Sequence, residues 1–179
     1  MAVTPNDAAL LERIARGESA ALAELMDRFA PGLMRYATHF LQSADDADEV
    51  LQDTFVRAER AIRKGVRPDQ MSAWLFRITV NRCRSRKRQF WRFIGGETGE
   101  AVIARASSPS RAEDTEWRDE ISRALAQLSA PTREAFLLKH VEGLTYEEMT
   151  EITGAGVPAL KMRVSRACDR LRDLLKDLR

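Results

Sequence analysis

The sequence predicts an all-α protein with two small helical domains joined by a flexible linker, the C-terminal one a helix-turn-helix. Apolar residues recur every three or four positions on both sides of the middle of the chain, and β-type alternation is almost absent. Glycines, serines and a proline separate these periodic segments. A chain of 179 residues with 44% hydrophobic residues can bury two cores. We therefore place the domains at 1–92 and 115–179 and the linker at 93–114.

The first two helices follow from capping residues and apolar spacing. Asn6 or Asp7 can cap a short helix that ends near Gly17, and Ser19 can cap the next helix. Pro31 interrupts this second helix, so a kink or break is expected there. Its expected apolar face consists of Leu22, Leu25, Met26, Phe29, Leu33 and Phe40.

The next two helices have equally local signals. Ser43, with Asp46 three residues later, predicts the start of a helix that runs to about Ile62. A turn with a glycine and a proline follows. A further helix then begins near Met71 and leads directly into the basic run 82–88.

The C-terminal half contains the most informative segment. Helices are expected over about 114–128 and 131–141. Thr145 and Glu148 then form a capping box, a Gly-Ala-Gly turn follows at 154–156, and a long helix begins at Val157. This order of a short capped helix, a tight turn and a long helix predicts a helix-turn-helix.

Composition and charge exclude several classes of protein. No segment approaches the roughly 20 apolar residues of a membrane span, and no secretory signal opens the chain, so a cytoplasmic protein without membrane insertion is expected. The two cysteines, Cys83 and Cys168, and the two histidines, His39 and His140, lack ligand spacing. We therefore expect no metal, no cofactor and no disulfide scaffold.

Positive charge is concentrated in two segments. Residues 81–92 carry 6 basic and no acidic side chains, and residues 156–179 carry 7 basic and 3 acidic ones, although the net charge of the whole chain is only +2. Lysine and arginine that neutralise phosphates are the general source of nucleic-acid affinity. The sequence therefore predicts a polyanionic partner that is contacted at two places.

One face of the long C-terminal helix is free to contact DNA. Its apolar stripe is expected to be buried and consists of Val157, Leu160, Val164, Cys168, Leu171, Leu175 and Leu178. The other face could be the solvated side of an ordinary amphipathic helix. The capped helix and glycine turn before it favour a recognition helix in the major groove. The residues predicted to contact DNA are Lys161, Met162, Arg163, Ser165 and Arg166.

Four segments together resemble the sigma-70 family of bacterial transcription initiation factors, specifically the extracytoplasmic-function (ECF) group. ADEVLQDTFVRA at 47–58 is similar to the family's core-binding helix, and AWLFRITVN at 73–81 to its promoter-melting helix. LTYEEM at 144–149 and KMRVSRA at 161–167 resemble its C-terminal helix-turn-helix. All four occur in the family's order, with a linker between the second and third.

The resemblance implies a function for each domain. The N-terminal domain would bind core RNA polymerase and the minus-ten promoter element, and the C-terminal domain would bind the minus-thirty-five element. The loop 63–70 matches in position the loop that captures a flipped base. An anti-sigma factor is an implied partner. Asp48, Glu49, Gln52 and Asp53 are the implied polymerase contacts, and the implied minus-ten contacts are Lys64, Arg67, Asn81, Arg82, Arg84, Arg86, Lys87 and Arg88.

Two other functions remain open at this point. An ordinary helix-turn-helix regulator would bind a duplex palindrome without polymerase. A metal-dependent nuclease would need a converging set of carboxylates, whereas the acids from Asp45 to Asp53 follow one another along one helix. We therefore expect that the chain is not an enzyme.

Overall fold

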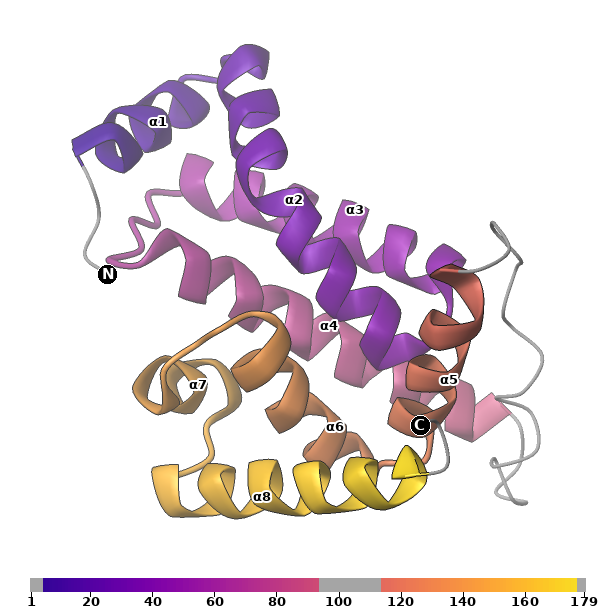
Figure 1. The fold of residues 1–179 in the computed structure, drawn as a ribbon. Coiled ribbons are helices and arrows are strands. Elements are labelled where there is room, and N and C mark those ends of the chain that lie inside the picture. Colours follow the sequence, from indigo (N-terminus) through magenta and orange to yellow (C-terminus); the bar gives the residue numbers. More distant parts are fainter. Residues whose placement is uncertain (1–4, 94–113, 177–179) are drawn as a thin grey trace.

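In the computed structural model, the chain is helical throughout residues 5–93 and 114–176, the parts that the structure describes, apart from short turns (Figure 1). No strand occurs within these ranges, so the predicted all-α class is confirmed. The helices are α1 (Pro5–Ala15), α2 (Ser19–Leu41), α3 (Ala44–Arg63), α4 (Met71–Phe93), α5 (Asp114–Ala126), α6 (Ala130–Phe136), α7 (Tyr146–Thr153) and α8 (Val157–Leu174), with a π-helical turn, η2 (Leu137–Val141), after α6.

The predicted capping residues start two of the helices. The Ser43 hydroxyl accepts a hydrogen bond from the Asp46 amide at 3.2 Å, at the head of α3. Thr145 and Glu148 form the predicted capping box at the head of α7. Gly154 then ends α7 with a φ of 74°, which glycine adopts without steric cost, and α8 follows in the predicted order.

Two helices differ from the prediction. α2 continues through Pro31 without the break that was one of the two expected outcomes, because buried Leu25 and Leu33 pack on either side of the proline and hold both parts in the same core. Met26 is 40% exposed rather than buried, and Tyr36 is fully buried instead. The helix predicted over 131–141 widens into the π-helical turn after α6, where the Glu142 amide donates to the Leu137 carbonyl at 3.0 Å.

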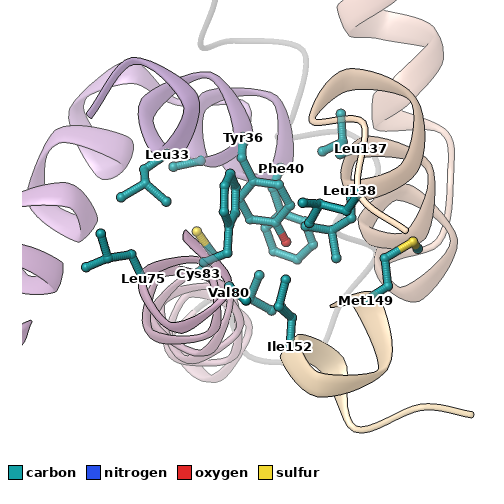
Figure 2. Close-up of a cluster of buried hydrophobic side chains, with 14 of the residues drawn as sticks. Leu33, Tyr36, Phe40, Leu75, Val80, Cys83, Leu137, Leu138, Met149 and Ile152 are labelled. Atoms are coloured by element: carbon teal, nitrogen blue, oxygen red, sulfur yellow. The ribbon is translucent and has the colours of Figure 1, made fainter. Parts of the chain in front are cut away.

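The two halves of the chain pack against each other. α4 lies beside α7, and α2 contacts both α6 and η2 (Figure 1). Side chains from both halves meet in one continuous core, where Tyr36 and Phe40 of α2 face Leu137 and Leu138 of η2 (Figure 2). The predicted linker 93–114 lies outside the described residues, except for its ends in α4 and α5, and Leu178 of the predicted stripe also lies outside them.

None of the helices in the described ranges is long and apolar enough to cross a bilayer.

Candidate nucleic-acid interface

The basic run of α4 is divided between two neighbours. Arg82 forms an ion pair with Asp53, and Arg86 binds Asp46 at 2.6 Å and Glu49 at 2.8 Å, all on α3. Hydrogen bonding to Asp46 raises the pKa of Arg86 above its usual value. These two arginines therefore hold α4 against α3 in this structure.

Arg84 points instead toward the C-terminal half. Its guanidinium donates to both carboxylate oxygens of Glu134, at 2.8 and 2.6 Å, and to the Thr153 carbonyl at 3.4 Å. The Glu134 side chain is only 4% exposed, so this ion pair is largely shielded from water. Hydrogen bonding to Glu134 raises the pKa of Arg84. A predicted minus-ten contact thus ties α4 to α6 and α7.

The other predicted minus-ten residues are more accessible. Asn81 and Arg88 are exposed on α4, and Lys64 is exposed at the end of α3. Arg67 is exposed too, but it donates to Glu12 at 3.0 Å and to the Ile62 carbonyl at 2.9 Å. Lys87 is half-buried, with its ammonium 5.4 Å from the centre of the Phe40 ring.

A cavity of about 400 Å³ lies beside the loop between α3 and α4. Asp69 and Gln70 of the loop form one wall, and Trp74 and Arg77 of α4 form another. Glu151 of α7 also lines it, so the C-terminal half contributes a carboxylate to this cavity. Arg77 was not among the predicted contacts, although it lies one turn before Asn81 on the same helix, a spacing that could have indicated it.

The exposed face of α8 carries four of its five predicted residues. Lys161, Ser165 and Arg166 are exposed, and Met162 is 51% exposed. Arg163 is half-buried and lines a cavity between the halves of the chain. The expected apolar stripe is buried at Leu160, Val164 and Leu171, and half-buried at Val157, Cys168 and Leu175.

The predicted polymerase contacts lie along the outer side of α3. Asp48, Glu49 and Gln52 are exposed. Asp53 is half-buried, because Arg57 binds it at 3.0 Å and Arg82 approaches it from α4. The carboxylate of Asp48 is therefore available to a protein partner, whereas Glu49 is paired with Arg86 and Asp53 is held in a fixed position.

Buried polar residues between the halves had no signal in the sequence. Arg133 is 1% exposed, and its guanidinium donates to four backbone carbonyls, among them that of Phe40 at 2.9 Å in the other half. Burial lowers the pKa of Arg133 to about 10. The Tyr36 hydroxyl lies in the same region and has no hydrogen-bond partner among the described residues, and burial raises the pKa of Tyr36.

A second ion pair joins the halves at their edge. The Arg35 guanidinium donates to both carboxylate oxygens of Glu142, at 2.9 and 2.7 Å. The Glu142 side chain is 4% exposed and that of Arg35 is 48% exposed. Gly32 lies directly beneath the pair, since a Cβ there would come within 3.2 Å of a Glu142 oxygen.

The two cysteines lie in different surroundings. Cys83 is buried, and burial raises its pKa to about 12, which makes its thiol inert near neutral pH. The Cys168 sulfur lies 3.6 Å from Nε2 of His140. No group of three or more metal-ligating side chains converges within the described parts of the chain.

Known proteins resemble this chain in both halves. Residues 25–93 match Sigma-70 region 2, and residues 118–171 match Sigma-70, region 4. The ECF RNA polymerase sigma factor EcfG of Rhodopseudomonas palustris is 33% identical over 145 residues, which is 81% of this chain and 80% of that protein. The RNA polymerase sigma factor CnrH of Cupriavidus metallidurans is 32% identical and covers 97% of both chains.

Two solved structures share the fold. The sigma factor RpoE in complex with the anti-sigma factor NepR, from Bartonella quintana, is 30% identical with a TM-score of 0.73, over 86% of this chain and 96% of that one. CnrH in complex with the cytosolic domain of CnrY is 29% identical with a TM-score of 0.67, over 94% of this chain and 96% of that one.

Proposed function

Since the chain belongs to the sigma-70 family, within its ECF group of RNA polymerase sigma factors, we propose that exposed faces of α3, α4 and α8 bind polymerase and promoter DNA. Members of this family are transcription initiation factors rather than enzymes. Initiation occurs where the polymerase and the chromosome are, so we assign the chain to the cytoplasm. The proposed binding of polymerase and promoter DNA rests on one observation, that both sigma regions match this one helical chain.

The α3 face is the proposed polymerase contact. Asp48, Glu49 and Gln52 project from one side of α3 into solvent, and Asp53 is fixed beside them by two arginines. Preorganised carboxylates bind a cationic partner surface at a lower entropic cost than mobile ones do. We therefore assign core RNA polymerase binding to this face.

The exposed side of α4 and the adjacent loop are the proposed minus-ten site. Asn81 and Arg88 can contact phosphates, and Lys64 and Arg67 flank the loop on its other side. The cavity between the loop and Trp74 offers an aromatic wall and polar side chains of Asp69 and Gln70. A base flipped from the duplex needs such a pocket, since unstacking costs a few kcal/mol.

The face of α8 is the proposed minus-thirty-five site. Lys161 and Arg166 can reach guanine edges or phosphates, and Ser165 can donate or accept a hydrogen bond. Met162 can only pack against a thymine methyl or a sugar. The Arg163 side chain can contact DNA together with this face once it no longer lines the cavity between the halves.

Promoter binding requires the two halves to separate in this proposal. Arg84 is bound to Glu134 in the arrangement seen here, and Arg163 is directed into the space between the halves. Glu151 places a carboxylate in the cavity proposed for the flipped base, where it would repel DNA phosphates. Separation would release both arginines and remove that carboxylate.

An anti-sigma factor is the proposed regulatory partner. RpoE, which shares this fold, was solved in complex with the anti-sigma factor NepR, and CnrH in complex with the cytosolic domain of CnrY. We extend such a partner to this chain because its halves present the same two regions. Co-purification of the chain free of any inhibitor, with full activity in unstimulated cells, would contradict this partner.

Reconstituted transcription tests the proposed function. The protein is mixed with core RNA polymerase and supercoiled promoter DNA, transcript starts are mapped, and permanganate marks unpaired thymines. We expect specific starts with a bubble just upstream that forms only with both proteins present. Tight binding to a duplex palindrome without polymerase or a bubble would favour the ordinary helix-turn-helix regulator instead.

A matched pair of α8 variants sharpens the assignment. Arg166→Ala removes a proposed DNA contact and should lower promoter occupancy about tenfold, the effect of one good contact to a base edge. Arg172 lies further along α8 and is paired with Asp169. Arg172→Ala should therefore leave promoter occupancy nearly unchanged. Equal effects of the two variants would contradict base recognition by this face.

A further inference from the structure

A second cavity, which we call the interdomain cavity, lies between the two halves and has a volume of about 560 Å³. Its walls come from α2, α4, α6, α8 and the turn after α7. Cavities of this size hold small molecules. Its charged lining consists of four cations and one carboxylate, namely Arg84, Lys87, Arg88, Arg163 and Glu134.

The single carboxylate cannot neutralise this lining. Both oxygens of Glu134 already accept hydrogen bonds from Arg84. Lys87 and Arg163 form no ion pair with any residue in the described ranges, and Arg88 donates only to the Ser85 hydroxyl. Three cations therefore face the cavity without a carboxylate partner.

A further positive charge lies behind the cavity. Arg133 is buried, and within the described residues its guanidinium is bound by carbonyl oxygens and by no carboxylate. Burial, and after it the charge of Arg133, lower the pKa of Lys87 to about 8. Holding uncompensated cations together in a partly dry space costs free energy, and a bound anion would recover it.

We propose that the interdomain cavity binds the oligophosphate chain of a small molecule, which bridges α4 and α8. Several negative charges and acceptor oxygens on one compact group match two guanidiniums and an ammonium that converge from different helices. Ala130 and Pro131 add apolar wall surface on which an attached ring could pack. Bound ligand would hold the halves together and withhold Lys87 and Arg163 from DNA, a regulatory role beyond promoter binding.

Calorimetric titration of the full-length protein with inorganic triphosphate tests the site. Lys87→Gln should weaken binding about tenfold, as expected for one lost hydrogen bond to a charged group. Lys176→Gln removes the same charge outside the cavity, where Lys176 pairs with Asp173, and should leave affinity nearly unchanged. Arg163→Gln, on the other half of the chain, should reproduce the loss and keeps the test valid if Lys87→Gln folds poorly. Equal losses in the Lys176 and Lys87 variants, or no binding below millimolar triphosphate, would overturn the proposal.

A variant outside the cavity tests whether both halves must be closed. Arg35→Glu should weaken triphosphate binding by repelling Glu142, and the double variant with Glu142→Arg should restore it. Unchanged binding in Arg35→Glu would overturn a bridging site. Binding of a short DNA duplex of random sequence is measured in the same variants, because the phosphates of DNA are the other ligand that these cations could bind. Binding of the duplex that is weakened by Lys87→Gln, with binding of triphosphate unchanged, would mean that the cavity cations bind DNA. That result would overturn the small-molecule site and leave the proposed sigma function intact.

Discussion

The interface between the two halves and the outer face of α8 use the same residue types in opposite ways. At the interface, Arg35, Arg84 and Arg133 are each bound by two carboxylate oxygens or by several carbonyls. On α8, Lys161 and Arg166 are exposed and form no ion pair with the described residues. Basic residues with fixed partners hold the fold together, whereas basic residues without partners are available to a ligand. The predictions below test this division.

The largest effect is expected at Arg133. Arg133→Met removes the donor for four carbonyls in a buried region and should lower the free energy of unfolding by about 3 kcal/mol. Arg166→Met, on the exposed face, should change it by less than about 0.5 kcal/mol. Urea denaturation followed by circular dichroism measures both, and similar losses would erase the proposed difference between the two regions.

The Arg35–Glu142 pair comes next. Arg35→Glu leaves the shielded Glu142 carboxylate facing a like charge, and we expect a loss of about 2 kcal/mol, moderated by the exposure of residue 35. Glu142→Arg should be similarly destabilising. The double exchange should recover most of the loss, because the two charges are opposite again. Additive losses in this cycle would indicate that the pair contributes no coupling.

Replacing Lys87 should raise the free energy of unfolding, whereas the substitutions at Arg133 and Arg35 should lower it. Its pKa in the folded protein, about 8, is below the ordinary 10.5, so folding disfavours its charge. In phosphate-free buffer, Lys87→Met should therefore raise stability by about 1 kcal/mol below pH 8, discounted for partial exposure. The gain should fade toward pH 10.5, where the unfolded lysine is also neutral. A pH series of urea melts checks this, and a gain that persists at high pH would exclude the charge as its cause.

The smallest effect is expected at Tyr36. Its hydroxyl is buried and has no partner in the part of the chain that the structure describes, so Tyr36→Phe removes an unsatisfied group and keeps the ring stack on Phe40. We expect a gain of about 0.5 kcal/mol. Thermal unfolding of the variant measures it. A loss above about 1 kcal/mol would mean that the hydroxyl is hydrogen-bonded in solution.

Local signals made the helices and the helix-turn-helix predictable. The Ser43 cap and the Thr145–Glu148 capping box concern residues three positions apart, and both occur as expected. The break considered at Pro31 does not occur, because tertiary packing holds α2 together despite the proline. Base and polymerase contacts remain predictions, since the sequence shows which side chains are charged but not which partner each one meets.

The packing between the halves could not be predicted. Arg133 binds the carbonyl of Phe40, 93 positions away, and Arg84 binds Glu134, 50 positions away. Neither contact has a periodic pattern or a spacing rule. As a result, the sequence treated residues 82–88 as one basic surface, whereas the structure divides them among α3, the C-terminal half and solvent.

A cross-link between the halves tests most directly whether they must separate at a promoter. Arg35→Cys and Glu142→Cys, in a Cys168→Ser background, are joined by a flexible bis-maleimide with a cleavable centre. With core polymerase and promoter DNA, the cross-linked protein should give no permanganate-reactive bubble, and cleavage of the linker should restore it to the level of the unlinked double variant. A bubble of equal intensity before and after cleavage would contradict the account.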